Sequence, residues 1–177
     1  MIRGIERRKI FLNKKDREGF LDRLAKLLPE TQTSCYGWTS LPNHAHFLFR
    51  TGNAPLSKLM RRLLTGYVVC FNRRHNRHGQ LFQNRYKSIV CQEDVYLKEL
   101  VRYIHLNPFR AGIVSNLDEL MDYPYCGHSA LIGEVKSMVW KLGTSFKRAT
   151  DSESDCEKSF MLLGCKRSRD VSKRFGT

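Results

Sequence analysis

Long apolar segments are absent from this sequence of 177 residues. No stretch approaches the roughly 18 consecutive apolar residues that read as a membrane-spanning helix. Residues 1–9 (MIRGIERRK) also contain no apolar core of a signal peptide. We therefore expect a cytoplasmic protein with no membrane partner. The 41% of hydrophobic residues is nevertheless enough for the core of one domain.

Closely spaced cysteines are also missing. The cysteines stand far apart, with no Cys-x-x-Cys pair and no zinc-finger spacing. This spacing disfavours a disulfide framework and a zinc site, so we expect reduced and mostly buried thiols. The six residues are Cys35, Cys70, Cys91, Cys126, Cys156 and Cys165.

Acidic residues are scarce as well. Asp and Glu number 17 against 31 Lys and Arg, which gives a formal net charge of +14. The excess is concentrated, because residues 1–90 hold 18 basic and 5 acidic residues whereas residues 91–130 hold 3 and 6. Such a field of one sign is typical of a protein that binds a polyanion, and nucleic acid is the first candidate. The alternative is a basic surface that serves only solubility.

The chain is long enough for one domain of about 100 to 150 residues plus an appendage. From Asp16 to Leu28 apolar residues recur at helical spacing, and Pro29 is expected to end that helix. Residues 33–39 and 44–50 are rich in aromatic and alternating residues around a turn at 41–43. This pattern predicts two paired strands.

Two further helices follow in the sequence. Residues from Pro55 to Phe71 place apolar side chains on one helical face, and acidic residues at 93–94 begin a helix that runs to about Asn107. Between them, residues 81–90 predict a strand or extended hairpin. Beyond them, residues 150–158 are typical of a linker and residues 166–174 form a basic run.

Two histidines lie in the second predicted strand. Because side chains alternate along a strand, His44 and His46 project from one face, about 7 Å apart along the backbone. Two neutral imidazoles in this position can bind a divalent cation and leave coordination positions open for a phosphate oxygen. The His-x-His pattern alone is also compatible with two core or surface histidines.

Tyr103 and Asn107 are four residues apart in the last predicted helix, so they share one face. A phenol one turn from an amide oxygen suits a tyrosine nucleophile beside a metal shell. A metal-bound phosphate assists such an attack by neutralising charge on the electrophile. The alternative interpretation is a half-buried core tyrosine followed by a helix-capping asparagine.

Four motifs in a fixed order resemble those of the REP-associated tyrosine transposases, which are single-tyrosine HUH transposases of small bacterial insertion sequences. The resemblance covers roughly residues 1–131, which we expect to form one domain. Residues 132–177 are then a C-terminal tail of unknown role, expected to be partly disordered or docked as a helix. The motifs are residues 41–49 (LPNHAHFLF), 71–75 (FNRRH), 79–89 (GQLFQNRYKSI) and 100–112 (LVRYIHLNPFRAG).

This resemblance implies roles for the site residues. His44 and His46 are the metal-binding pair, Tyr103 is the nucleophile, Asn107 is a third metal ligand, and the cofactor is a divalent metal, Mg²⁺ or Mn²⁺. The implied reaction is transesterification on single-stranded DNA at hairpins formed by palindromic repeats. Tyr103 attacks a phosphodiester, a 5′-phosphotyrosine forms, a 3′-OH is freed, and a second attack rejoins the strand.

The resemblance also implies an α/β (α+β) fold. The expected fold is a ferredoxin-like sandwich with an antiparallel sheet that carries the histidine strand and with helices on one face. Family members begin with a further strand-forming segment, whereas this chain starts almost at Arg3 and Gly4. We therefore expect a short first strand and an exposed edge on the histidine strand.

Basic residues of the first half are the expected DNA contacts, and nearby rings are expected to stack on unpaired bases. The alternative for each is a solvated surface residue or, for Phe82, a core position. The expected phosphate contacts are Arg61, Arg62, Arg73, Arg74, Arg77, Arg85 and Lys87, and the rings are His75, His78, Phe82 and Tyr86.

The main expectation is therefore a metal-dependent DNA nickase and strand transferase that acts in DNA transposition. The rival is a catalytically inactive protein that binds repeat palindromes. A hydrolytic nuclease that uses water in place of Tyr103 is disfavoured, because the sequence shows no extra carboxylates near the histidines for a two-metal site. The sequence leaves a monomer and a homodimer open.

Overall fold

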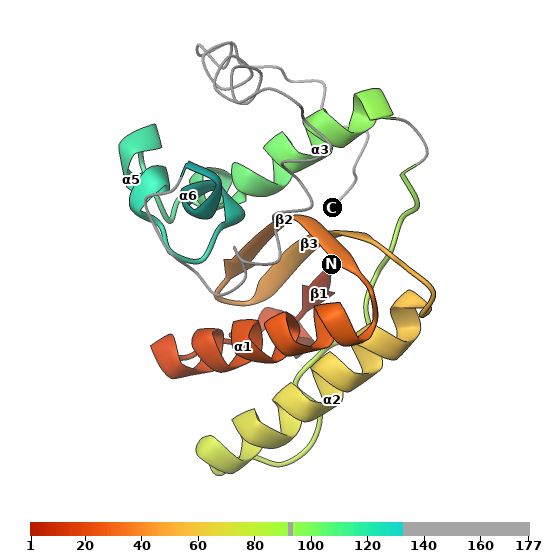
Figure 1. Cartoon of the computed structure of the whole chain (residues 1–177). Helices are drawn as coiled ribbons and strands as arrows, with labels where there is room; N and C mark the ends of the chain where they lie inside the picture. Colours follow the sequence, from red (N-terminus) through yellow and green to blue (C-terminus); the bar gives the residue numbers. More distant parts are fainter. Residues whose placement is uncertain (92–93, 133–177) are drawn as a thin grey trace. The chain divides into compact units, whose positions relative to one another are not determined.

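A three-stranded antiparallel sheet lies at the centre of the computed structural model, which describes residues 1–91 and 94–132 (Figure 1). Its strands are β1 (Ile2–Arg3), β2 (Ser34–Leu41) and β3 (His44–Arg50). Their spatial order is β1-β3-β2, so the strand that carries both histidines is the central one. β1 is two residues long and pairs with the first two residues of β3, in agreement with the expected short first strand.

Helices cover both faces of this sheet (Figure 1). They are α1 (Lys14–Glu30), α2 (Leu56–Arg74), α3 (Asp94–His105), α4 (Asn107–Arg110), α5 (Leu117–Asp122) and α6 (Gly127–Ile132), and a short 3₁₀ helix, η1 (Ile5–Arg7), follows β1. On one face, Phe20 of α1 stacks on Phe47 of β3 with ring centroids 5.9 Å apart. On the other face, a side chain at Gly37 of β2 would lie within 4 Å of Val101 in α3.

The expectation that helices lie on one face is therefore wrong, and the alternation of β3 gives the reason. Ala45 and Phe47 project toward α1 and α2, whereas His46 and Leu48 project toward α3. Both Ala45 and Leu48 are buried, so each face of the central strand has apolar surface that a helix shields from water.

Aromatic rings form the core between the sheet and α1 and α2. The Phe20 ring contacts the Tyr67 ring of α2 edge to face at a centroid distance of 5.0 Å, and Phe11 contacts Phe20 at 5.4 Å. The Tyr67 hydroxyl donates a hydrogen bond to the Ile10 carbonyl. Burial raises the pKa of Tyr67 well above its ordinary value, so this hydroxyl keeps its proton and stays a donor. The core thus fixes the segment before α1 against α2.

Segments outside the named strands run along both edges of the sheet. Beside β1, the Ile5 amide donates to the Leu81 carbonyl at 3.0 Å; beside β2, the Ser40 amide donates to the Tyr125 carbonyl at 2.8 Å. These bonds satisfy edge groups that would otherwise be open to pairing with another chain. The structure confirms the expected mixed α/β fold with an antiparallel sheet, and residues 81–87 run beside β1.

The sequence predicted the main elements, and the differences lie at their ends. α1 ends at Glu30, one residue after Pro29, and the Thr31 amide closes it by donating to the Leu27 carbonyl at 3.0 Å. Pro55 is the N-cap of α2 instead of its first residue. α3 ends at His105, and Asn107 begins the separate α4.

Short elements account for the other differences. α5 and α6 have six residues each, too few for a helical period to be visible in the sequence. The strand predicted over 81–90 is reduced to a single bridge, between Phe82 and Gly4. The expected linker, basic run and C-terminal tail lie outside the described residues. Within residues 1–91 and 94–132, no helix combines the length and apolar character that crossing a bilayer requires.

Candidate active site

His44, His46 and Tyr103 come together on the face of the sheet that α3 covers. The rings of His44 and His46 have centroids 5.2 Å apart, and the Tyr103 ring of α3 lies 6.2 Å from the His46 ring. All three side chains are half-buried. The sheet strand and the helix are distant in sequence, so packing of α3 on β3 is what creates this cluster.

Asn43, in the turn before β3, orients the first histidine. Its Oδ1 lies 2.6 Å from His44 Nδ1, and its Nδ2 donates to the Arg7 carbonyl at 3.3 Å. Because the amide nitrogen is committed to a carbonyl, the oxygen is the acceptor and His44 Nδ1 carries the proton. Nε2 of His44 is then the nitrogen with a lone pair for a cation.

Both histidines are neutral at physiological pH. Burial, with the nearby Arg3 guanidinium, lowers the pKa of His44 to about 4. Burial, the neighbouring His44 and the positive charges of Met1 and Arg3 lower the pKa of His46 to about 3. A neutral imidazole is the form that binds a metal, so the site is prepared for a cation without any need to remove a proton near pH 7.

Asn107 and Arg110 flank the tyrosine. Asn107 is buried, and its Nδ2 donates to the main-chain carbonyls of Tyr103 (2.9 Å) and Ile104 (3.3 Å). These bonds hold the amide nitrogen against α3 and leave the oxygen as the atom able to bind a cation. The guanidinium carbon of Arg110 lies 4.6 Å from the centroid of the Tyr103 ring, so a positive charge stands beside the phenol.

The donor set suits one divalent cation with open positions. Two imidazole nitrogens on one strand can bind such a cation and leave positions open for substrate oxygens. Among residues 1–91 and 94–132, no group of three or more His, Cys, Asp or Glu side chains gathers as a metal site. His44 and His46 are the candidate metal ligands whose rings the structure brings together.

The basic residues predicted to contact DNA fall into two groups. Arg85 and Lys87 belong to the segment beside β1, where the Lys87 amide donates to the Met1 carbonyl at 2.9 Å. The others belong to α2 or the loop after it, and α2 packs on the face opposite the histidines. In this second group, Arg62 contacts Glu30 of α1 at 2.7 Å.

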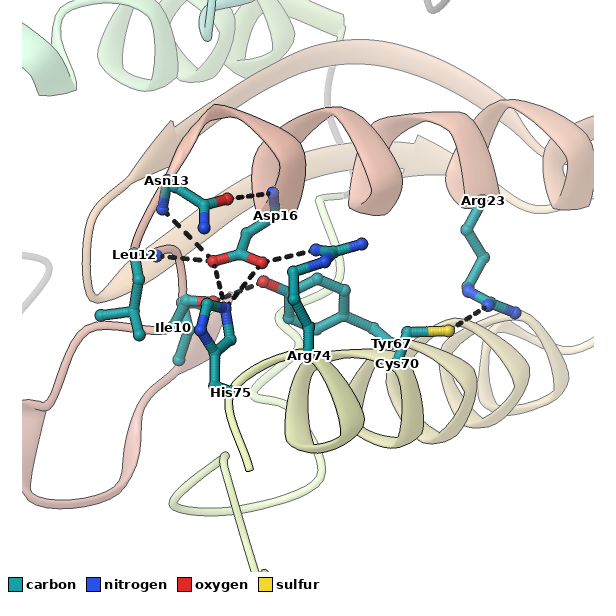
Figure 2. Close-up of polar contacts among 9 residues, drawn as sticks. All are labelled: Ile10, Leu12, Asn13, Asp16, Arg23, Tyr67, Cys70, Arg74 and His75. Carbon is teal, nitrogen blue, oxygen red and sulfur yellow. Dashed lines mark hydrogen bonds and ion pairs between the residues drawn. The ribbon is translucent and has the colours of Figure 1, made fainter. Parts of the chain in front are cut away.

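Arg74 of this second group contacts a buried carboxylate (Figure 2). Asp16 is fully buried, and its oxygens accept from Arg74 Nη1 at 2.6 Å and lie 2.9 Å from His75 Nε2. The Leu12 and Asn13 amides also donate to Asp16, at 2.9 and 3.3 Å, while Asn13 caps α1. This network joins the start of α1 to the end of α2.

Sequence reasoning did not single out three residues at this site: Arg3, Asn43 and Arg110. Asn43 and Arg110 lie within the motifs that contain the histidines and the tyrosine. This position in the motifs could have identified them as candidate site residues. Arg3 gave a weaker signal, because its place beside His44 depends on the pairing of β1 with β3. Such pairing between distant segments is not visible in a local pattern.

Comparisons with known proteins identify a family and a similar fold. A family model described as "Transposase IS200 like" matches residues 1–107. The chain is also similar to a solved structure described as a REP-associated tyrosine transposase bound to a REP hairpin, with 18% identity, a TM-score of 0.59, and coverage of 78% of this chain and 81% of that chain. At this identity the likeness shows a shared fold. A search of curated proteins finds no significant match. Because the family model spans more than half of the sequence, the chain belongs to the IS200-like transposase family.

Proposed function

We propose that this protein is a metal-dependent DNA nickase and strand transferase that cleaves and rejoins single-stranded or hairpin DNA through a 5′-phosphotyrosine. The observation that carries the proposal is the position of the Tyr103 ring, 6.2 Å from the ring of His46. A nucleophile and a histidine pair are thereby placed close enough to act on one phosphate.

In the proposed reaction, the Tyr103 oxygen attacks the phosphorus of a phosphodiester and loses its proton. The bond between phosphorus and the 3′ oxygen breaks, and that oxygen takes up a proton to leave as a 3′-OH. The DNA 5′ phosphate is then linked to Tyr103, which preserves the bond energy for rejoining. The reverse attack by a 3′-OH releases Tyr103 and restores a phosphodiester.

His44 and His46 are proposed to hold Mg²⁺ or Mn²⁺, with Asn107 as a third ligand. Such a cation supplies charge neutralisation at the phosphate and fixes its orientation. Asn43 keeps the proton on Nδ1 of His44, which leaves Nε2 available. Arg110 places a positive charge beside the Tyr103 ring, where it favours the developing negative charge of the attacking oxygen.

Hairpin DNA is the proposed substrate. It is the ligand named for the solved transposase with the similar fold, and the basic first half of this chain fits a polyanion. Because Arg62 and Arg74 contact the protein's own carboxylates, we assign the phosphate contacts to the other predicted residues. These are Arg61, Arg73, Arg77, Arg85 and Lys87.

The test is the covalent adduct itself. Wild-type protein incubated with a labelled hairpin oligonucleotide and Mn²⁺ should give a species of slower mobility on a denaturing gel, and Tyr103→Phe should abolish it while binding is retained. Tyr125→Phe, which removes the phenolic hydroxyl of a half-buried ring packed against the core, is the matched control and should leave the adduct unchanged. An adduct that survives in Tyr103→Phe would contradict the assignment of the nucleophile.

Two other outcomes separate the rival functions. Tight hairpin binding without an adduct in Mg²⁺ or Mn²⁺ would identify a protein that only binds repeat palindromes. Cleaved DNA with no protein attached would identify a hydrolytic nuclease. The proposed transferase requires both the adduct and its reversal, which is measured as religation when a strand with a free 3′-OH is added.

A further inference from the structure

The segment beside β1 begins in a regular register. The Ile5 amide donates to the Leu81 carbonyl at 3.0 Å, and the Gln83 amide donates to the Arg3 carbonyl at 3.0 Å. Going from the first bond to the second, the chain moves back two residues, from Ile5 to Arg3, and forward two residues on the facing segment, from Leu81 to Gln83. This is the spacing of an antiparallel ladder.

This register breaks after Gln83. A continued ladder would place Met1 opposite Arg85, but Met1 is bonded to Lys87 in both directions, at 2.8 and 2.9 Å. Residues 84–86 thus face the single residue Ile2, two residues more than a regular ladder allows, and form an irregular bulge. Bulges of this kind reorient side chains at sheet edges and are common beside active sites.

The bulge opens a shallow pocket between its own side chains and β1. Tyr86 lines this pocket while it also packs against the hydrophobic core, so its ring is held in place. The Arg3 Nε atom is buried and has no hydrogen-bond partner among the described residues. The complete lining is Met1, Arg3, Gln83, Asn84, Tyr86 and Lys87.

This pocket adjoins the proposed active site through Arg3. In the pairing of β1 with β3, Arg3 is the partner of His44. Residues directly opposite in an antiparallel pair project from the same face, so the Arg3 side chain lies on the histidine face of the sheet. A DNA strand whose phosphate lies at the histidines would therefore extend a neighbouring nucleotide toward the bulge.

We propose that the bulge pocket binds one unpaired base next to the cleaved phosphate and gives the protein a base preference at that position. The chemistry is that of base recognition: an aromatic ring for stacking, two amides that each offer a donor and an acceptor, and flanking cationic groups for the adjoining phosphates. This inference rests on the proposed function, because it takes single-stranded DNA as the ligand.

The test uses binding alone, so that it does not depend on cleavage. Full-length protein carrying Tyr103→Phe is incubated with a pool of single-stranded DNA of random sequence, and the bound fraction is sequenced. One position should show enrichment of a particular base. Adding Asn84→Ala or Tyr86→Ala should reduce that enrichment by about 5-fold or more, the loss expected for one stacked or hydrogen-bonded base.

Matched variants make the result specific. Gln80→Ala changes an exposed amide in the same segment outside the pocket and should preserve the enrichment. Asn84 is exposed, so Asn84→Ala leaves the core intact even if Tyr86→Ala is poorly folded. A base preference that persists in Asn84→Ala and Tyr86→Ala, or its absence from the starting protein, would overturn the pocket. Failure to retain any DNA would instead overturn the proposed function.

Discussion

At the scale of single residues, Asn43 determines which nitrogen of His44 is available for a cation. Its amide group donates to the Arg7 carbonyl and accepts from His44 Nδ1. The imidazole is therefore held in one orientation through its Nδ1 atom. Gly4 supports the same turn, since its amide donates to the Asn43 carbonyl at 2.8 Å. A side chain at Gly4 would collide with the Arg8 carbonyl, at 2.1 Å. The β2–β3 turn therefore depends on close backbone packing by the segment after β1.

Removal of the Asn43 amide is expected to weaken metal binding. Asn43→Ala leaves His44 free to change tautomer and ring orientation, and loss of such an orienting partner typically costs 10- to 100-fold in affinity. Titration of Mn²⁺ into the protein by calorimetry should show a dissociation constant at least about 10-fold higher. Asn53→Ala, an exposed asparagine in the loop after β3, is the control. Equal affinities for the two variants would show that Asn43 does not position His44.

At the scale of the elements, Asp16 joins α1 to α2. Burial favours the protonated carboxyl, but hydrogen bonds from His75 and Arg74 and from the Leu12 amide outweigh it, and the pKa of Asp16 lies below its ordinary value of 3.8. The charged carboxylate therefore stabilises the folded state. This network also fixes the end of α2, from which the chain continues through the basic loop to the bulge beside β1.

Replacement of this carboxylate should reduce stability in a pH-dependent way. Asp16→Asn is expected to lower the free energy of unfolding at pH 7 by about 3 kcal/mol, the lower end for a broken buried pair because Arg74 is partly exposed. Since the folded pKa is depressed, the wild-type advantage is complete above pH 3.8 and declines as the pH falls through and below that value.

Urea unfolding from pH 7 down to pH 3 measures this difference. Asp22→Asn, in the same helix but half-buried, is the matched control and should change stability by less than about 0.5 kcal/mol. A loss of stability in Asp16→Asn that is unchanged between pH 7 and pH 3 would mean that the charge of Asp16 contributes nothing.

At the scale of the whole molecule, the basic residues predicted to bind DNA lie in two separate regions. Arg85 and Lys87 lie on the segment beside β1, near the proposed site, whereas Arg61, Arg62 and Arg73 lie on α2. Part of the positive charge is neutralised within the protein, as in the contact between Arg62 and Glu30. We therefore expect the salt dependence of DNA binding to report fewer contacts than the total charge suggests.

This division predicts different effects of two arginine substitutions. Arg85→Ala should reduce the slope of the logarithm of the binding constant against the logarithm of salt concentration by about 0.7, the value for one phosphate contact on single-stranded DNA. Arg62→Ala should leave the slope unchanged, because its partner is Glu30. Fluorescence anisotropy of a labelled oligonucleotide across a salt series measures both. A larger change in Arg62→Ala than in Arg85→Ala would show that Arg62 contacts a DNA phosphate despite its ion pair with Glu30.

Local patterns in the sequence were sufficient for the features that depend on neighbouring residues. The alternation of a strand put His44 and His46 on one side of β3, and helical spacing put Tyr103 one turn before Asn107. Packing between distant segments decided the rest. It brought α3 onto the histidine face, engaged Arg74 with the buried Asp16, and opened the bulge beside β1. Strand alternation and helical spacing are patterns of residues close together in the sequence. The contacts between distant segments depend instead on which surfaces the whole chain must bury together.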